Sequence, residues 1–133
     1  MKPFHLEIVT PDGLAFSGEV ESLLVRTDDG DVEILAGHAE FLASLATGRA
    51  RLLIDGKPRY AAASGGFISV QSGAVKLVAI TFEFAENIDL ARAKRARERA
   101  EAAMSKTLSE RDERIVKAKL ARAMSRINVA ELI

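Results

Sequence analysis

The feature that most constrains the fold of this chain is an abrupt change in composition between residues 86 and 89. All nine glycines, all three prolines and all seven aromatic residues precede residue 88, whereas ten alanines follow it. Residues 1–87 carry 7 basic and 12 acidic side chains, and residues 88–133 carry 12 basic and 7 acidic ones. Aromatic residues favour strands, glycine and proline favour turns, and alanine favours helices. The chain therefore predicts two structural units of different class, residues 1–87 and residues 88–133.

The first unit has the sequence pattern of a β-sandwich. Short runs in which apolar and polar residues alternate, such as residues 4–10 and 49–54, are separated by turn sequences about every ten residues. Turns are expected at Pro11–Gly13, Asp28–Gly30 and Asp55–Gly56, because proline fixes φ and glycine tolerates positive φ. About eight to ten short strands fit this spacing, which is typical of a sandwich or a flattened barrel.

The second unit predicts two antiparallel helices that form a hairpin. Asp89 and Ser109 have the residue types of helix N-caps, and the segment 104–109 between them is rich in Ser and Thr, as expected of the break. A seam of small and apolar residues is expected between the helices: Ala93, Ala96, Ala100 and Ala103 on the first, and Val116, Leu120, Ala123, Met124 and Ile127 on the second. Such a seam buries little area, so the hairpin needs the sandwich, a ligand or a partner, and its arrangement can change.

Several function classes are excluded by composition and motifs. The chain has no cysteine and only two histidines, so disulfides, thiolate zinc sites and a histidine metal centre are not expected. No phosphate-loop, dinucleotide-binding or zinc-protease motif occurs, and Gly65-Gly66 predicts a turn. His38 has no accompanying nucleophile, which favours a structural role. No apolar run approaches a membrane span or a signal peptide, so we expect a soluble protein made without a cleaved leader. The absence of cysteine fits a reducing compartment, and we expect no catalytic residues.

The arginines of the hairpin are the best candidates for a binding site. Five of them recur at helical spacing: Arg92, Arg95 and Arg99 on the first helix, and Arg122 and Arg126 on the second. In an antiparallel hairpin these guanidinium groups could surround one volume near Asp89, and such groups suit phosphate oxygens. Spacing alone favours a solvated basic face paired with acids of another chain over an anion site. A nucleic-acid binder is disfavoured, because neither helix carries an aromatic residue for base stacking.

Five motifs in order along the chain resemble the epsilon subunit of the F-type ATP synthase, which is called delta in mitochondria. They are Val9–Gly13, Ile34–Ala39, Ser64–Phe67, Ile88–Ala93 and Arg122–Ala130, so the resemblance covers the whole chain. The chain departs from the family at Ala36 and Glu40, where proline is usual, and at Glu33, where glycine is common. These departures affect the loop near His38 but leave the two-domain interpretation unchanged.

The resemblance implies a rotor subunit with no catalysis of its own. The sandwich of residues 1–87 would bind the gamma subunit and the c-ring, and an acidic loop of residues 28–40 would face the ring. The contact residues implied there are Asp31, Glu33, His38 and Glu40. The hairpin of residues 88–133 would either fold against the sandwich or extend toward the alpha/beta hexamer and inhibit ATP hydrolysis. The protein would lie at the cytoplasmic side of the bacterial inner membrane, peripherally and without direct insertion.

The resemblance also implies a nucleotide site, because in some bacterial members the folded hairpin binds ATP. The residues here that match that site are Glu83, Ile88, Asp89, Arg92, Ala93, Arg99, Arg122 and Arg126. The arginines would hold the phosphates, and the two acids would address the adenine or the ribose. ATP would then be a regulatory ligand, with no obligatory cofactor and no metal. The alternative function is a free-standing module that senses ATP or another anion and is not part of a rotor.

Overall fold

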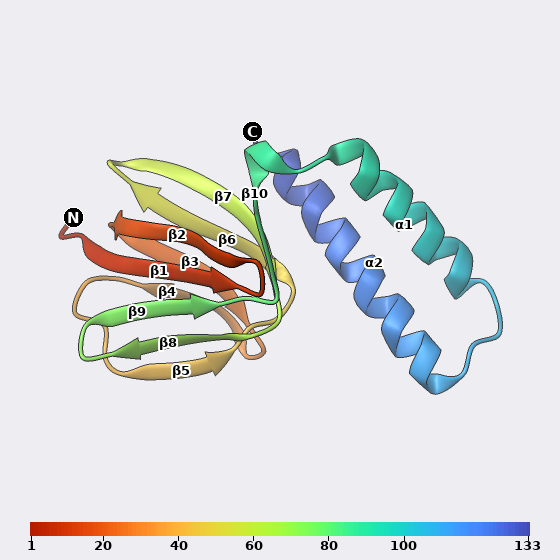
Figure 1. The fold of residues 1–133 in the computed structure, drawn as a ribbon, viewed down its shortest axis with the longest axis horizontal. Coiled ribbons are helices and arrows are strands. Elements are labelled where there is room, and N and C mark those ends of the chain that lie inside the picture. The colour runs from red at the N-terminus through yellow and green to blue at the C-terminus, as the bar shows by residue number, and fades with distance from the viewer.

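The computed structural model describes residues 1–133 and contains ten strands followed by two helices (Figure 1). The strands are β1 (Phe4–Thr10), β2 (Gly13–Val20), β3 (Ser22–Thr27), β4 (Gly30–Ile34), β5 (Phe41–Ser44), β6 (Gly48–Ile54), β7 (Lys57–Ser64), β8 (Phe67–Gln71), β9 (Ala74–Val78) and β10 (Thr81–Phe84). They form two five-stranded sheets, with the orders β2-β1-β9-β8-β5 and β10-β7-β6-β3-β4. The predicted fold class, a β-sandwich of about ten strands followed by an antiparallel two-helix hairpin, is confirmed.

The core of the sandwich lies between the two sheets, where alternate residues of each strand point inward. On β1, for example, Phe4, Leu6 and Ile8 are buried and the residues between them are exposed. The predicted turn at Gly65-Gly66 is confirmed between β7 and β8. Gly66 has φ +86°, and a Cβ atom there would overlap the carbonyl oxygen of Val78, so the close approach of backbones requires glycine.

A short connection leads from the sandwich into the hairpin. It consists of the 3₁₀ turn η1 (Ala85–Asn87) and two extended residues, after which come α1 (Leu90–Met104) and α2 (Glu110–Ala130). The predicted N-caps are confirmed: the Asp89 carboxylate accepts the backbone N–H of Arg92 at 3.0 Å, and the Ser109 hydroxyl accepts that of Asp112 at 3.1 Å. Each cap satisfies an N–H group that the first helical turn leaves free.

The two helices pack along a narrow seam, and α2 is the one that contacts the sandwich (Figure 1). Ala93 and Ala100 of α1 and Ala123 and Ile127 of α2 are buried, as the predicted seam requires. The prediction that Met124 belongs to the seam is wrong, because Met124 is 47% exposed and is not among the buried residues of α2. The reason is geometric: adjacent residues on a helix point about 100° apart, so Met124 cannot share the direction of Ala123.

A separate small cluster holds the hairpin against the sandwich. Val129 near the end of α2 is 1% exposed and packs with Ala62 of β7 and Ala85 of η1, while Tyr60 and Ile88 cover the margin. This cluster of three buried residues is distinct from the cluster of 17 buried residues inside the sandwich. The contact that positions the hairpin is therefore small compared with the core that holds the sandwich together.

Candidate functional site

A cavity of about 220 Å³ lies where the hairpin meets the last strand of the sandwich. It is bounded by residues of β10, of the start of α1 and of the end of α2: Glu83, Asp89, Arg92, Ala93, Ala96, Arg99 and Arg126. The small side chains of Ala93 and Ala96 leave space beneath the guanidinium groups. Because the lining comes from both helices and from β10, this cavity exists only while the hairpin is folded against the sandwich.

A second cavity of about 400 Å³ continues along the groove between the helices. It shares Ala96, Arg99 and Arg126 with the first cavity and adds Lys119 and Arg122, together with apolar residues of the seam. Its charged lining is four basic side chains, and no acidic residue lines it. The two cavities together therefore form a basic groove that suits a polyanion with an extended shape.

The contacts inside the groove leave several cations available. Arg126 Nε lies 3.2 Å from Glu83 Oε1, and these side chains are 32% and 40% exposed. The Asp89 carboxylate is engaged by the backbone N–H of Arg92. The guanidinium groups of Arg92 and Arg99, by contrast, make no hydrogen bond or ion pair within the chain. Like charges held near one another repel, so a bound anion would relieve an unfavourable interaction.

The structure brings most of the sequence-predicted nucleotide residues together. Six of the eight predicted residues line the first cavity and Arg122 lines the second. Ile88 does not line either; it packs at the margin of the Val129 cluster. The prediction that five arginines share one volume is wrong for Arg95, which lines neither cavity. At 100° per residue, Arg99 lies within about 20° of Arg92 around the helix, whereas Arg95 lies about 60° away.

Lys119 is a lining residue that sequence reasoning missed. It lies three residues before Arg122 and seven before Arg126, so the same periodicity that selected the arginines also includes it. The predicted set holds guanidinium groups alone, and Lys119 carries an ammonium group instead. Its ammonium group adds a point charge to the wider end of the groove.

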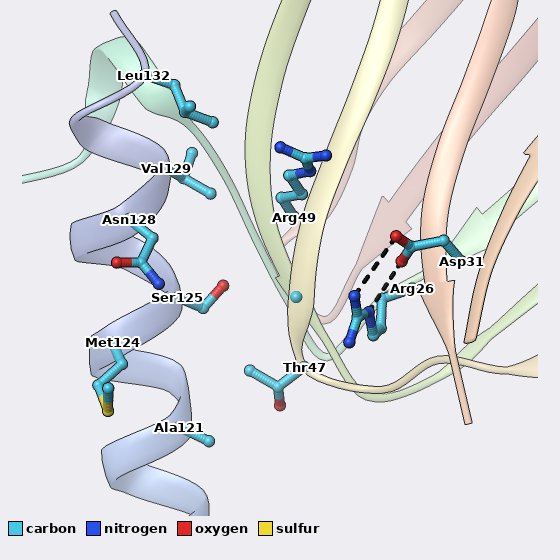
Figure 2. Close-up of a pocket in the computed structure, with 11 residues that line it drawn as sticks. Arg26, Asp31, Thr47, Arg49, Ala121, Met124, Ser125, Asn128, Val129 and Leu132 are labelled. Carbon is cyan, nitrogen blue, oxygen red and sulfur yellow. Dashed lines mark hydrogen bonds and ion pairs between the residues drawn. The ribbon is translucent and has the colours of Figure 1, made fainter. Parts of the chain in front are cut away.

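A third space, of about 390 Å³, lies between α2 and the sandwich (Figure 2). Arg26 and Asp31 form one wall as a paired fork, with contacts of 2.8 and 3.4 Å. Arg49 of β6 reaches into the space without an ion pair, and Ser125 of α2 carries a buried hydroxyl with no partner. These groups fill a junction between domains, and they show that α2 meets the sandwich through a loosely packed interface.

The residues predicted to face the c-ring do not lie on one loop, which corrects the prediction of an acidic loop at residues 28–40. The segment is a tight turn, strand β4 and a second loop. The turn between β3 and β4 lies at the end of the sandwich nearest the helices, where Asp31 lines the third space, beside α2. Strand β4 leads away from that end (Figure 1). Asp28 in the turn meets Ser44, the last residue of β5, whereas His38 and Glu40 precede the first residue of β5 and so lie toward its other end. The prediction failed because it treated neighbours in sequence as neighbours in space across an intervening strand.

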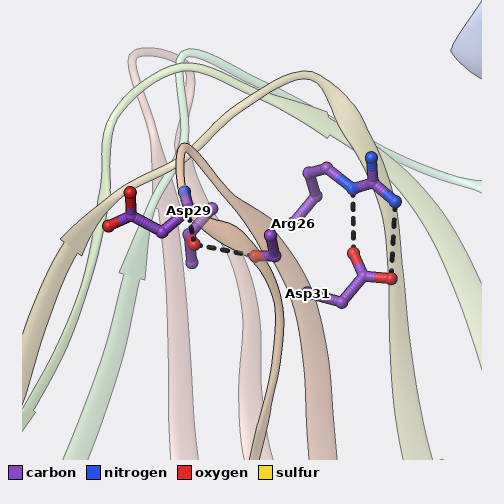
Figure 3. A network of polar contacts seen from close by, with 5 residues as sticks. Arg26, Asp29 and Asp31 are labelled. Atoms are coloured by element: carbon purple, nitrogen blue, oxygen red, sulfur yellow. Dashed lines mark hydrogen bonds and ion pairs between the residues drawn. The ribbon is translucent and has the colours of Figure 1, made fainter.

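The acidic residues of the segment 28–40 are also less available than their number indicates. The Thr27 hydroxyl donates to the Gly30 carbonyl at 2.7 Å and accepts the Asp29 backbone N–H at 3.2 Å, which shapes the turn (Figure 3). Asp31 is paired with Arg26, and Glu33 accepts a 2.7 Å hydrogen bond from Arg51. The Asp31 carboxylate is therefore the partner of an arginine on the adjacent strand β3, and the Glu33 carboxylate is the partner of an arginine on β6, beyond β3.

His38 is held by local contacts. Its Nδ1–H donates to the carbonyl oxygen of Ala39 at 2.7 Å, and its ring meets the edge of Phe41 with centroids 5.6 Å apart. These contacts fit the structural role that the sequence favoured. No group of three or more His, Asp or Glu side chains is arranged to hold a metal ion. Neither helix is both long enough and apolar enough to cross a membrane.

The exposed face of the first sheet carries an apolar row at the end nearest the hairpin. Leu14, Val9, Val78 and Phe67 are paired in register across β2, β1, β9 and β8. Leu14 is 60% exposed and Phe67 is 41% exposed. Four apolar side chains in line across a sheet are more than scattered surface residues, and such a strip is typical of an interaction surface.

The fold is a β-sandwich whose last strand and C-terminal two-helix hairpin enclose a groove lined by basic side chains. Comparisons with known proteins specify the family. A family model described as the beta-sandwich domain of the ATP synthase delta/epsilon chain matches residues 3–85. A second, described as the long alpha-helix domain of the same chain, matches residues 86–131. The chain belongs to the ATP synthase delta/epsilon family, as an epsilon subunit of the F-type enzyme.

Individual relatives agree with this assignment. The ATP synthase epsilon chain of Bacillus velezensis is 41% identical over 130 residues, which cover 98% of both chains. That of Ruminiclostridium cellulolyticum is 38% identical over 128 residues and 96% of both. Among solved structures, a chain of the Euglena gracilis mitochondrial ATP synthase (OSCP/F1/c-ring) matches with a TM-score of 0.81 at 25% identity, over 98% of this chain and 82% of that one. A chain of the Tetrahymena thermophila central stalk and c-ring matches with a TM-score of 0.71 at 8% identity, over 97% of both chains, which is a likeness of fold alone.

Proposed function

We propose that this chain is a non-catalytic subunit of the rotating central stalk of an F-type ATP synthase and that its hairpin is a sensor of ATP. The folded hairpin binds ATP in the basic groove. Released, it extends toward the alpha/beta hexamer and inhibits ATP hydrolysis. The observation that carries the proposal is the cavity between α1, α2 and β10, where Arg92, Arg99 and Arg126 surround a space closed by Glu83 and Asp89.

The charges of the groove suit a nucleotide triphosphate. Arg92 and Arg99 have free guanidinium forks, and Arg122 and Lys119 extend the basic lining, so the phosphates have several donors within one groove. Phosphate oxygens can replace Glu83 as the partner of Arg126. The two acids lie at the end of the groove nearest β10, where they can accept hydrogen bonds from the base or the ribose. No metal is needed to complete this arrangement.

The same geometry supplies a switch. A ligand shifts an equilibrium only by binding one state more tightly than the other. The groove is built from both helices and from the sandwich, so ATP binds the folded arrangement and not the extended one. When ATP is scarce, repulsion among the arginines favours release, and the freed basic helices are attracted to acidic surfaces of the hexamer.

The sandwich supplies the attachment to the rotor. The apolar row of Leu14, Val9, Val78 and Phe67 supports docking of the gamma subunit, because a strip of exposed apolar side chains gains free energy when it is covered. The remaining contact is with the c-ring, which places the subunit peripherally at the cytoplasmic side of the bacterial inner membrane. Co-purification with gamma separates this role from that of a free-standing anion sensor.

Calorimetry with the full chain tests the nucleotide site. Arg92→Ala removes charge-assisted hydrogen bonds worth about 1.5–3 kcal/mol each, so ATP should bind at least about tenfold more weakly. Arg95→Ala is the matched control, because Arg95 is on the same helix but lines neither cavity, and it should bind ATP like the unmodified chain. Equal loss in both variants, or no binding at millimolar ATP by the unmodified chain, would contradict the proposal.

A further inference from the structure

Arg59 joins the strand β7 to the turn that leads into the hairpin. Its Nε and Nη2 atoms lie 2.7 and 2.6 Å from Oε1 of Glu86, the middle residue of η1. Its Cζ atom also lies 3.5 Å from the centre of the Phe84 ring. One guanidinium group thus contacts Phe84, the last residue of β10, by its face and Glu86 of the connecting segment by its edge. We call Arg59, Phe84 and Glu86 the hinge clamp.

The clamp rests on a rigid support. Phe84 is 7% exposed, and its ring meets Phe82 and Phe16 edge to face, with centroids 5.0 and 6.2 Å apart. Phe84 lies on β10, at one edge of its sheet, and Phe16 lies on β2, at the edge of the other sheet. The aromatic cluster therefore closes one side of the sandwich, and the face of Arg59 covers it. An arginine over an aromatic ring gains both cation–π attraction and apolar contact.

The pKa of the Glu86 carboxyl group agrees with its contact to Arg59. Its pKa lies below the ordinary value, first because its own backbone N–H donates to the carboxylate, and then because Arg59 donates to it and carries positive charge; partial burial opposes the shift. Glu86 is consequently ionised wherever the protein functions near neutral pH. Ala85 beside it is 2% exposed, so η1 is fixed at two adjacent positions.

The residues after the clamp have no comparable anchor. Only Ile88 and Asp89 separate η1 from α1, and both have extended backbone, with φ, ψ of −75°, 126° and −80°, 97°. Hinges are a few element-terminal residues that absorb changes in φ and ψ. Ile88 packs at the margin of the cluster that contains Val129 of α2, so release of α2 would also free Ile88.

We propose that Arg59 is a positioning residue that keeps η1 on the sandwich in both arrangements of the hairpin, so that the pivot is Ile88–Asp89. The clamp also sets the start of α1: Asp89 follows Glu86 by three residues and lines the same cavity as Glu83. Arg59 lines no part of that cavity, so it acts on the nucleotide site only through the position of Asp89. The inference rests on the proposed function in one respect, which is that the hairpin moves.

The structure offers a matched pair of variants. Arg59→Gln breaks the clamp, and Arg51→Gln breaks a similar arginine–glutamate pair on the same sheet, where Arg51 contacts Glu33 at 2.7 Å. The first measurement is amide hydrogen exchange at Ile88, whose N–H donates to the Ala85 carbonyl at 3.2 Å. Exposed ion pairs and cation–π contacts contribute modest free energies. Exchange at Ile88 should therefore be about fivefold faster in Arg59→Gln and unchanged in Arg51→Gln. Unchanged exchange in Arg59→Gln would overturn the proposal.

ATP affinity and distances in the full chain complete the test. Arg59→Gln should weaken ATP binding about fivefold while Arg51→Gln leaves it unchanged, and Arg59→Lys should not restore it, because lysine lacks the planar fork. Spin labels on cysteines are simple to place, since the chain has none. With a reference label at Gln71, the distance to Asn87 should be the same with and without ATP, whereas the distance to Glu98 changes. A change at Asn87 as large as that at Glu98 would overturn the proposal.

The outcomes separate this inference from the proposed function. If the unmodified chain binds no ATP but exchange at Ile88 responds to Arg59→Gln alone, the sensor role fails and the clamp stands. If ATP binds with the expected dependence on Arg92 but Arg59→Gln alters neither exchange nor affinity, the sensor role stands and the clamp fails.

Discussion

Val129 is the side chain on which the docking of the hairpin depends most, so Val129→Ala should release the hairpin. Val129 is the only large apolar residue among the three that are buried in the contact with the sandwich. The substitution removes two carbon atoms from a site that is 1% exposed, and at about 0.8 kcal/mol per buried methylene the docked state loses about 1.6 kcal/mol. The ratio of released to docked chains should therefore rise about fifteenfold.

Other contacts cannot compensate for this loss. The ion pair between Arg126 and Glu83 is 3.2 Å long, but its side chains are 32% and 40% exposed, and exposed pairs contribute at most about 1 kcal/mol. The remaining buried side chains, Ala62 and Ala85, are already the smallest that carry a Cβ. The residual cavity left by Val129→Ala should make the effect larger rather than smaller.

Single-molecule energy transfer measures the released fraction directly. Dyes on cysteines at Gln71 and Lys106 report the distance between the far end of the sandwich and the tip of the hairpin, and both sites are exposed. Ile115→Ala is the control, because Ile115 is on the same helix and 42% exposed, away from the contact. The reasoning is refuted if Val129→Ala leaves the released fraction unchanged, or if Ile115→Ala changes it equally.

Three further predictions follow from particular contacts. Gly66→Ala should destabilise the sandwich by about 3 kcal/mol or more in chemical unfolding, because the new methyl group collides with the Val78 carbonyl and φ is positive. The stability that Glu86 contributes should be fully present above the ordinary glutamate pKa of about 4.3 and be lost only as the pH falls through its lower folded-state pKa, so unfolding midpoints of wild type and Glu86→Gln should converge in acid. Asp31 follows the turn where Asp28 meets Ser44, at the end of β5, whereas Glu40 precedes the first residue of β5, so of cysteines at Asp31 and Glu40 only one should crosslink to the c-ring in the assembled complex.

The sequence predicts the elements of this fold better than the contacts between them. The caps at Asp89 and Ser109 and the turn at Gly65-Gly66 follow from local chemistry, and local chemistry is what a sequence pattern records. The arginines of the groove also follow, since helical periodicity places Arg92 and Arg99 on one face. Arg95 was also expected in the groove, but it lies about 60° from Arg92 around the helix and lines neither cavity.

Contacts between distant segments left no such local signal. Arg59 and Glu86 are 27 residues apart, and nothing near either residue indicates that they meet. Val129 belongs to the same helix as the predicted seam, but it faces the sandwich, and the direction in which a helix docks depends on the shape of the partner surface. The acidic segment 28–40 shows the same limit, because the intervening strand β4 separates its two ends.

The most direct test of the central claim is the distance between the sandwich and the hairpin tip as ATP is varied, in the full subunit within the assembled enzyme. Dyes at Gln71 and Lys106 should report a short distance at millimolar ATP and a longer one as ATP is removed. Arg92→Ala should need at least about tenfold more ATP to restore the short distance, because its phosphate contacts are missing. A distance that stays the same from zero to millimolar ATP in the unmodified chain would contradict the account.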